Sequence, residues 1–484
     1  STGCDTELLA WGLDEYGIDF IDEIDSMHGF AYYDIKKNTI TLSRDHAGIK
    51  PLFYAKIDKG LVFGSEIKGM LDIVPNSRTL DNLACSMISR VGTNPLRNTL
   101  FSNIKKVLPG ETIMYNLDNK SLECVKRIYI KPNADNDYSK NELKEMFASA
   151  VRQCAIGKRK IGVFLSGGLD SSVVAYELQQ HINSANTFTN RISPEIQADE
   201  DYNSDSKTAK KFASDQKFNH HDVVVSPTEY LSAWDDSIWY MEQPNYNPSN
   251  PMYCYTNKYL ADSGIVITLA GDMGDELLGG YAKYNVLFDK EKKPTSWKEL
   301  LKLWLERIKK GSYKLIEQPV DDNTLLDELE NCYSDELWNP QDPTASYMAL
   351  DCVTQVPESF FTRNDYYGMA YSMEGRFPLA SKKFMQYCLN IKSKHKFKGT
   401  QAKFLVKEAY KKFLPEYIIN KEKTGWTVPV GYWLMDNVDG NLTKKYDQAI
   451  GIERLKTQGR SQKIGKRLMP EWQVKNWKEK YKIK

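Results

Sequence analysis

The stretch "VFLSGGLDSSVV", Val163 to Val174, sets two adjacent glycines, an aspartate and three serines between two apolar runs. The run that leads into it, "KIGVFLS", is typical of a buried strand, and "DSSVVAYELQQHI" has the spacing of a helix. The first N–H groups of a helix have no partner inside the helix, and the helix dipole attracts negative charge to that end. The stretch therefore predicts an anion-binding turn between a strand and a helix.

The side chains of this turn favour a polyphosphate that carries a metal ion. Gly167 and Gly168 allow the backbone to come close to a phosphate group. Hydroxyl groups that can donate hydrogen bonds belong to Ser166, Ser171 and Ser172. Asp170 would repel a phosphate, so its presence is explained if Mg²⁺ bridges its carboxylate to the phosphates. The turn lacks the GxxxxGK[ST] pattern of Walker-type loops.

The segments on the two sides of the turn predict different folds within an α/β chain. Strand-like and helix-like segments alternate in residues 138–450, which indicates a doubly wound parallel sheet followed by a mostly helical part. Residues 1–130 begin with a helix over 5–16, which we expect Asp5 to cap, and continue with short β-rich runs typical of an antiparallel sheet. Residues 451–484 are basic and are expected to form a surface helix or tail.

Two later segments carry charges that belong beside the turn. "LAGDMGDELLGGY", Leu269 to Tyr281, follows another buried strand and contains Asp272, Asp275 and Glu276. Because the carboxyl ends of neighbouring parallel strands open into one crevice, we expect Asp275 to share the metal ion with Asp170. "NKEKTGWTVPVGYW" offers Lys423, a cation that would offset the charge that develops as pyrophosphate leaves.

The composition is that of a globular protein and gives no indication of a nucleic-acid or membrane partner. The 484 residues are 41% hydrophobic and 27% charged, and their formal net charge is +1, which gives no electrostatic reason to expect nucleic acid or an anionic membrane. No apolar run approaches the roughly 20 residues of a membrane span, and the first residues lack the pattern of a signal peptide. The eight cysteines are scattered, as is typical of reduced thiols, so we expect a cytoplasmic protein.

The three charged segments together resemble the synthetase domain of glutamine-dependent asparagine synthetases, whose first loop is the PP-loop of ATP pyrophosphatases. Upstream, "GFAYYD", "SRDHAGIKPLFY" and "FGSEIKGML" resemble the second half of the class II glutaminase domain of that family, which has an Ntn-type fold. Downstream, "DYYGMAYSMEGRFPL" resembles the family segment S-x-E-x-R-x-P, and "GTQAKFLVKEAYKKFLPEYI" resembles the helix that follows it. The resemblance extends over nearly the whole chain in family order and implies an adenine nucleotide α-hydrolase-like fold.

The resemblance also implies a role for each matching residue. Pyrophosphate would be held by Ser166, Gly167, Gly168, Asp170 and Ser171, and ATP would be flanked by Leu165 and Gly271. Mg²⁺ would be bound by Asp170 and Asp275. The catalytic residues would be Lys423, which stabilises the transition state of adenylation, and Asp272, which contacts the reacting intermediate. Asp5 would bind the amino group of glutamine, and Glu374 and Arg376 would belong either to the acceptor site or to the structural frame.

The reaction that the resemblance implies has two halves. Glutamine is hydrolysed to ammonia in the N-terminal domain. In the synthetase domain, a substrate carboxylate attacks the α-phosphorus of ATP, and ammonia then displaces AMP from the acyl-adenylate. The adenylate must be kept from water, which favours a buried site that is fed internally with ammonia. The expected acceptor is aspartate, the expected cofactors are ATP and Mg²⁺, and a homodimer is a possible assembly.

The chain departs from the family pattern in both the glutaminase domain and the synthetase domain. It begins past the point at which the family's glutaminase has its N-terminal cysteine nucleophile, so we expect an incomplete glutaminase domain that could use free ammonia but could not hydrolyse glutamine alone. After Arg376, the chain reads "FPLAS", without the aspartate that the family often has there. This difference weakens the assignment of aspartate as the acceptor.

Several other functions remain open. An amidotransferase of the same mechanism could act on another carboxylate, such as a surface-polysaccharide uronate. A cyclase similar to β-lactam synthetase would use an internal amine, and the glutamine-site Asp5 argues against it. A non-catalytic binding protein conflicts with the intact "SGGLDSS", Asp275 and Lys423. A tRNA-modifying PP-loop enzyme conflicts with the net charge near zero.

Overall fold

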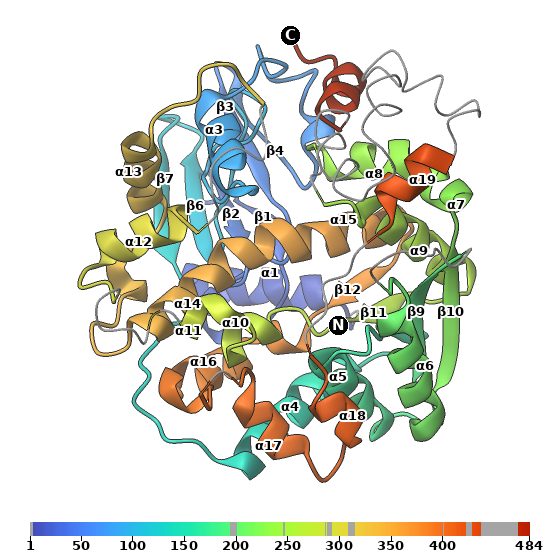
Figure 1. Ribbon diagram of the computed structural model, residues 1–484. Coiled ribbons are helices and arrows are strands. Elements are labelled where there is room, and N and C mark those ends of the chain that lie inside the picture. Colours follow the sequence, from blue (N-terminus) through green and yellow to red (C-terminus); the bar gives the residue numbers. More distant parts are fainter. Residues whose placement is uncertain are drawn as a thin grey trace.

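The computed structural model describes residues 3–193, 201–244, 247–285, 287, 293–307, 315–399, 401–422, 428–436 and 473–484. Three β-sheets lie within these residues, surrounded by helices (Figure 1). Two of the sheets are antiparallel and come from the N-terminal part of the chain, and the third is parallel.

The two N-terminal sheets confirm the predicted antiparallel fold. The four-stranded sheet has the order β1-β2-β6-β7, with β1 (Gly29–Asp34), β2 (Thr39–Arg44), β6 (Glu111–Asn116) and β7 (Leu122–Arg127). The three-stranded sheet has the order β4-β3-β5, with β3 (Phe53–Ile57), β4 (Gly60–Gly64) and β5 (Lys105–Lys106). Asn38 adopts a positive φ of 51° in the tight turn between β1 and β2, a conformation that asparagine tolerates.

The first helix differs from the prediction in its cap. Helix α1 covers Asp5–Tyr16, but its N-cap residue is Cys4, and Asp5 is the first helical residue. The Asp5 carboxylate accepts a hydrogen bond from the backbone N–H of Thr6 at 2.8 Å. Asp5 therefore acts in the first turn, where a negative charge favours the helix dipole, rather than as the cap.

The central sheet is parallel throughout and has the strand order β10-β9-β8-β11-β12. Its strands are β8 (Ile161–Phe164), β9 (Asn186–Ile192), β10 (Asn219–Val225), β11 (Ile267–Leu269) and β12 (Glu374–Arg376). The chain moves outward from β8 to β10 and then returns to the other side of β8 with β11. The strand order therefore reverses between β8 and β11, and ligands of such sheets bind outside the carboxyl ends at this point.

Helices cover both faces of this sheet, which confirms the doubly wound fold. The helices that lead outward are α5 (Leu169–Gln179) and α6 (Ser204–Gln216), and α9 (Asn250–Asp262) leads back to β11. Because parallel crossovers are right-handed, α5 and α6 lie on one face and α9 lies on the other. Helix α4 (Lys140–Cys154) precedes the sheet, and the Ser139 side chain caps it by accepting a hydrogen bond from the N–H of Glu142.

The chain after β11 is mostly helical, as expected. The helices after β11 are α10 (Gly274–Leu278), α11 (Ala282–Asn285), α12 (Trp297–Leu305), α13 (Asp322–Cys332), α14 (Pro343–Val353), α15 (Thr362–Ala370), α16 (Lys382–Asn390), α17 (Phe404–Tyr410), α18 (Glu416–Ile419) and α19 (Val430–Asp436). Four other helices precede β11, namely α2 (Phe20–Glu23), α3 (Asn82–Val91), α7 (Pro227–Ser232) and α8 (Trp234–Met241). Part of the basic C-terminal segment lies outside the described residues. Residues 473–481 form a helix, in which Trp477 is fully buried with its ring 5.4 Å from that of Phe101.

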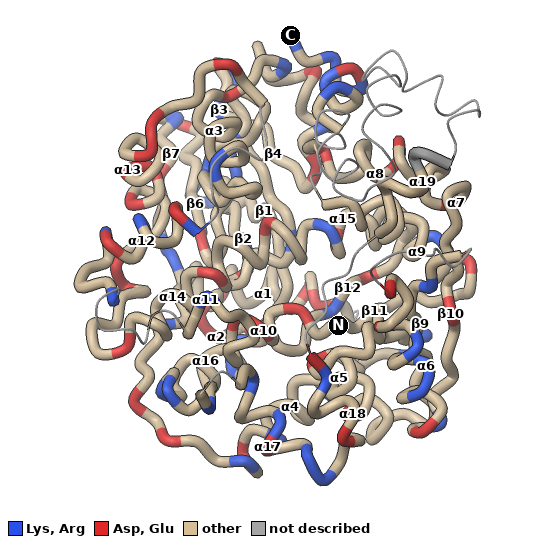
Figure 2. The backbone as a smooth tube through the Cα atoms, in the orientation of Figure 1, with Lys and Arg blue, Asp and Glu red and all other residues tan. Residues whose placement is uncertain are grey.

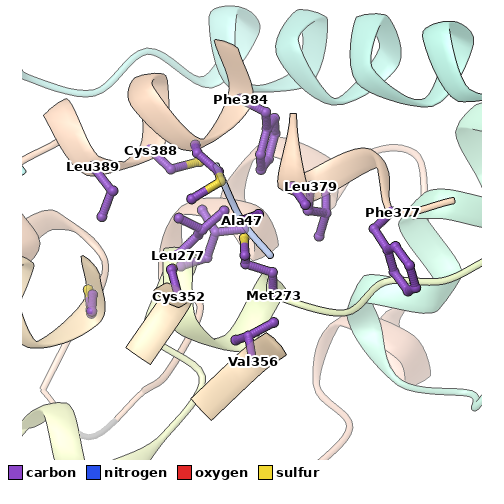
Figure 3. Packing of buried hydrophobic residues seen from close by; sticks show 14 of the residues in the cluster. Ala47, Met273, Leu277, Cys352, Val356, Phe377, Leu379, Phe384, Cys388 and Leu389 are labelled. Atoms are coloured by element: carbon purple, nitrogen blue, oxygen red, sulfur yellow. The ribbon is translucent and has the colours of Figure 1, made fainter. Parts of the chain in front are cut away.

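One hydrophobic core joins the N-terminal part to the part that contains the parallel sheet. Ala47, from the loop after β2, packs in the same cluster as Met273 and Leu277 of the second charged segment and Cys388 of α16 (Figure 3). This packing fixes the position of Leu269 to Tyr281 against the buried core. All eight cysteines lie in the described part and none forms a disulfide.

Charges of both signs are interspersed along the described backbone (Figure 2). No helix within the described ranges has both the length and the apolar composition needed to cross a membrane.

Candidate active site

The turn over residues 165–168, between β8 and α5, lies at the carboxyl end of β8. Gly168 is the N-cap of α5, and the Ser171 hydroxyl donates to the Gly168 carbonyl oxygen at 3.2 Å. Ser171 Oγ also accepts from the N–H of Ser166 and lies 3.0 Å from the Ser166 hydroxyl. These bonds hold the turn around the start of α5. Ser166, Gly168, Asp170 and Ser171 line a cavity there, whereas Ser172 is fully buried and does not.

Gly167 has a packing role in this turn. Its φ is +74°, and a Cβ at this position would lie 2.7 Å from the carbonyl oxygen of Asp205 in α6. Only glycine adopts this conformation at such a close approach without strain. Gly167 therefore allows the turn between β8 and α5 to pack closely against the first turn of α6. It is not among the residues that line the cavity.

The second charged segment follows β11 and meets the turn directly. Gly271 and Gly274 face Asp170: a Cβ on Gly271 would lie 2.9 Å from Asp170 Cβ, and one on Gly274 would lie 2.7 Å from Asp170 Cγ. The two glycines thus make room for the Asp170 side chain between the loops. Asp272 and Asp275 line the same cavity. Glu276 is buried outside the lining, and burial raises its pKa to about 8.

Lys403 brings the two carboxylates together. It precedes α17 in a left-handed conformation (φ 54°), and its Nζ lies 2.5 Å from Asp275 Oδ1 and also pairs with Asp170 Oδ2. Burial opposes the charged ammonium, but the carboxylates of Asp170 and Asp275 outweigh it and raise the pKa of Lys403 above its usual value. Asp170 and Asp275 therefore share one cation at the junction of β8 and β11.

The oxygen donors at this junction fit Mg²⁺. Hard oxygen ligands are those that Mg²⁺ prefers, and it commonly uses one or two carboxylates together with substrate phosphates. A Cβ on Gly280 would lie 1.8 Å from Asp275 Oδ1, so the glycine leaves the space that this carboxylate needs. No cluster of three or more His, Cys, Asp and Glu side chains suited to a metal ion lies within the described ranges. A metal held here would thus take its remaining ligands from substrate or water.

The cavity around this junction has a volume of about 630 Å³. On the β8–β9 side it is lined by Phe164, Leu165, Phe188, Thr189 and Asn190. It is also lined by Tyr253 of α9, whose ring centre lies 5.1 Å from that of Phe164, and by Asp272, Phe360 and Arg363. The lysines of the lining are Lys403, Lys407 and Lys421; Lys403 pairs with Asp170 and Asp275, and Lys421 pairs with Asp205. The cavity therefore combines aromatic and apolar walls with charges of both signs.

Asp272 is one of the residues that line this cavity. Its Oδ2 accepts a hydrogen bond from the side-chain amide of Asn364 in α15 at 2.8 Å. Burial raises the pKa of Asp272, while Arg363 and the Asn364 bond act in the opposite direction. The carboxylate thus faces the cavity from the loop after β11, held in place by α15.

Three other predicted residues lie elsewhere. Lys423 falls outside the described residues, although Lys421 and Glu422 just before it line the cavity. Glu374 and Arg376 lie in the edge strand β12, outside the cavity lining. Arg376 donates to Glu374 at 2.7 Å and to the carbonyl oxygens of Cys154 and Ile156, so it ties β12 to the end of α4.

Asp5 lines a second cavity, of about 560 Å³, in the N-terminal part. This cavity also contacts α15, through Asp365, Tyr366 and Met369. Lys50, in the loop before β3, forms an ion pair with Asp365 at 2.6 Å and lines the cavity as well. Helix α15 therefore contributes to both cavities: Arg363 faces the first, and Asp365 faces the second.

Comparison with known families matches both parts of the chain. Residues 142–480 match the family described as asparagine synthase, and residues 1–129 match the glutamine amidotransferase domain. The chain belongs to the asparagine synthase family. As a member of it, this protein is a ligase that forms carbon–nitrogen bonds.

The relatives that this family member resembles are glutamine-hydrolysing asparagine synthetases. Asparagine synthetase 1 of Bacillus subtilis is 24% identical over 478 residues, which are 91% of this chain and 73% of that protein. Asparagine synthetase 3 of the same organism is 24% identical over 529 residues, with 99% and 83% covered. Asparagine synthetase B of Escherichia coli is 24% identical over 457 residues, with 90% and 67% covered. The family follows from the match over residues 142–480, and an identity of 24% does not establish the acceptor.

Sequence reasoning missed two side chains of this asparagine synthase-type cavity. Lys403 lies within a segment whose resemblance was recognised, but as one of several lysines in a helical pattern it gave no sign of its partners. Arg363 precedes the quoted segment that starts at Asp365 and has no motif of its own. Only the burial of a cation in a cavity could have identified either residue, and burial follows from the tertiary packing.

Proposed function

We propose that this chain catalyses the ATP-dependent amidation of a carboxylate through an acyl-adenylate, with aspartate as acceptor and glutamine or ammonia as nitrogen donor. The observation that carries this proposal is the meeting of Asp170, Asp275 and Lys403 at the carboxyl ends of β8 and β11. Two carboxylates and a lysine around a helix N-terminus suit a metal-bound polyphosphate. The family match supplies the class of reaction.

In this proposal, the start of α5 binds the pyrophosphate part of ATP. Its ligands are the hydroxyls of Ser166 and Ser171 and backbone N–H groups of the turn, including that of Gly168. Asp170 and Asp275 hold Mg²⁺, which when bound neutralises phosphate charge and so makes pyrophosphate a better leaving group. Lys403, released from the two carboxylates, is within reach of the same phosphates. Leu165 and Gly271 flank the adenosine.

The covalent steps follow from carboxylate chemistry. An oxygen of the acceptor carboxylate attacks the α-phosphorus of ATP, the bond from this phosphorus to the bridging oxygen breaks, and pyrophosphate leaves. Ammonia then attacks the acyl carbon, AMP leaves with the former carboxylate oxygen, and the nitrogen loses a proton. Lys423 is proposed to stabilise the charge in the first step. Asp272 is proposed to contact the intermediate from the loop after β11.

The N-terminal part is proposed to supply the nitrogen. Asp5 lines a cavity large enough for glutamine and is assigned to its amino group. Helix α15 borders both cavities, so ammonia released on one side would have only this helix and its neighbours to pass. A short internal route keeps water from the adenylate.

A second candidate is an amidotransferase of the same mechanism that acts on another carboxylate, such as a uronate. It is favoured by Ser381, which stands where the family often has the aspartate of P-F-L-D. No described residue of the cavity lining specifically favours a β-lactam-synthetase-like cyclase.

The test is pyrophosphate release from ATP and Mg²⁺ with ammonium chloride, with and without L-aspartate. Release that depends on aspartate, with asparagine as product, would establish the acceptor. Asp170→Asn should lower this release by a factor on the order of 10² to 10³, whereas Asp262→Asn at the exposed end of α9 should not change it. Absence of release with aspartate, in protein that still binds ATP, would exclude this acceptor and favour a screen of uronates.

A further inference from the structure

A buried ion pair joins the N-terminal part to the segment that precedes α15. Nζ of Lys106, in β5, lies 2.9 Å from Oε1 of Glu358, and the two side chains are only 7% and 12% exposed. The same ammonium donates a hydrogen bond to the carbonyl oxygen of Asn94. Burial lowers the pKa of Lys106, and the negative charge of Glu358 opposes this shift. Each side chain depends on the other, because either charge alone would be costly to bury.

Glu358 belongs to a π-helical turn, Pro357–Phe361, that leads directly into α15. The N–H of Thr362 bonds to the carbonyl oxygen of Pro357, five residues back, and the Thr362 hydroxyl donates to the same oxygen at 2.7 Å. Turns of this kind are rare and occur often at functional sites. Because successive residues of an α-helix are about 100° apart, a return of this turn to α-helical bonding would rotate its side chains by about that angle relative to α15.

The register of the turn decides which side chain faces the first cavity. Phe360 lines the 630 Å³ cavity, and its ring centre lies 5.8 Å from the guanidinium carbon of Arg363, which lines the cavity as well. The next residue, Phe361, is fully buried in the core, with its ring 4.5 Å from that of Phe377. A shift of the turn by one residue would therefore disturb the cavity wall and the core together.

The space beside the ion pair is too small for a substrate. Lys106 and Glu358 line a cavity of about 40 Å³, together with Asn94 and Thr362. Such a volume holds a few water molecules at most, whereas pockets for small-molecule ligands have volumes of about 300 to 1,000 Å³. The ion pair therefore does not contact a substrate there, and its influence on the first cavity passes through the turn.

We propose that Lys106 and Glu358 are positioning residues, through which the N-terminal part keeps the π-helical turn in the register that places Phe360 in the wall of the first cavity. This inference rests on the proposed function, because it takes that cavity as the site of adenylation. The N-terminal part then serves the synthetase reaction through its packing, in addition to any supply of nitrogen. Without Lys106, the carboxylate of Glu358 reaches water only if the turn moves.

The test uses Lys106→Met in the full chain and measures two quantities. The first is hydrogen exchange of the backbone amides of residues 358–362 without substrates, which should become at least tenfold faster because the ion pair no longer holds the turn. The second is pyrophosphate release from ATP and Mg²⁺ with L-aspartate and ammonium chloride, which should fall at least about tenfold because the cavity wall is displaced. Arg90→Met is the matched control, since it breaks another ion pair between the two parts, with Asp322 at 3.1 Å, and should leave both quantities unchanged.

A double variant separates positioning from stability. In Lys106→Met/Glu358→Gln the uncompensated carboxylate is absent, so the midpoint of thermal unfolding should recover most of what Lys106→Met loses. The turn still lacks its anchor, so exchange should stay fast and release should stay low. A purely structural role of the ion pair would instead restore release together with the unfolding midpoint.

Three results would overturn the inference: unchanged exchange of the turn in Lys106→Met, recovery of release in the double variant, or an equal loss of release in Arg90→Met. If Lys106→Met is not folded, Glu358→Met takes its place and should show the same faster exchange and lower release. Failure of the proposed function looks different. In that case, wild type would also give no pyrophosphate, and the exchange of the turn would still show whether the ion pair holds it.

Discussion

Nζ of Lys403 lies 2.5 Å from Oδ1 of Asp275 and pairs at the same time with Asp170, so one ammonium balances two carboxylates from two different loops. Each of the three side chains is at least four-fifths buried. A metal ion that binds to these carboxylates must compete with this ammonium. The apparent metal affinity and the stability of the apoprotein are thus linked through one residue.

Lys403→Met should destabilise the apoprotein and increase its response to Mg²⁺. Without the ammonium, the two carboxylates repel each other in a low-dielectric site, at a cost of roughly 2 to 3 kcal/mol given their partial exposure. Thermal unfolding with and without Mg²⁺ checks this, and the midpoint should rise more on Mg²⁺ addition in the variant than in wild type. The matched control is Lys407→Met, because Lys407 lines the same cavity and forms no ion pair with a carboxylate of the described residues. An equal Mg²⁺ response in all three proteins would contradict the competition.

Gly274→Ala should impair nucleotide turnover while leaving the fold intact. The added Cβ would lie 2.7 Å from Asp170 Cγ, so the carboxylate must move away from its place beside Asp275. Pyrophosphate release should fall by at least about tenfold, since small misplacements of a site residue have large effects. Gly69→Ala, whose Cβ would meet nothing within 4 Å, should be neutral. Unchanged turnover by Gly274→Ala would show that the position of Asp170 is unimportant.

Lys50→Met should weaken the attachment of the N-terminal part to the synthetase part. Lys50 is the ionic partner of Asp365, which is only 5% exposed, and burial raises the pKa of Asp365 while Lys50 opposes this. Leaving this carboxylate unpaired should cost about 3 kcal/mol and lower the midpoint of thermal unfolding. Adding Asp365→Asn should restore much of the loss, because the uncompensated charge is then removed. Lys56→Met, at an exposed site, is the control. If the effects of Lys50→Met and Asp365→Asn on the free energy of unfolding were additive, the proposed coupling between Lys50 and Asp365 would be refuted.

Stability should fall in mild acid partly because of His28. Burial lowers the pKa of His28 from 6.5 to about 4, so the native ring stays neutral at a pH at which the unfolded chain already binds a proton. The free energy of unfolding therefore decreases as the pH falls from about 6.5 towards 4, by at most about 1.4 kcal/mol per pH unit for this residue.

His28→Gln should remove this contribution, so that its unfolding midpoint changes less than that of wild type between pH 7 and pH 5. His181→Gln, at an exposed position after α5, should retain the wild-type pH dependence. The same pH dependence in wild type and His28→Gln would rule out His28 as a source of acid sensitivity.

The elements around the nucleotide turn could be predicted because their signals are local. Apolar runs of strand length and glycine positions lie within a few residues of each other, and β8 and α5 lie close to where these patterns predict them. The closeness of Asp170 and Asp275 could be predicted from one topological rule: the carboxyl ends of neighbouring parallel strands open into one crevice where the strand order reverses. The cap of α1 was misjudged, because Asp5 suits both the N-cap and the first helical position.

The sequence by itself determined that the chain has an antiparallel N-terminal part and a parallel sheet with a phosphate-type turn, since these depend on periodicity and turn chemistry over short distances. Only the tertiary structure decided which cations enter the cavity. Lys403 is 233 positions from Asp170, and Arg363 is buried in the cavity beside Tyr253, where its charge opposes the rise in the pKa of Asp272. The charge of a side chain is visible in the sequence, but its desolvation and its partners arise only when distant segments pack together.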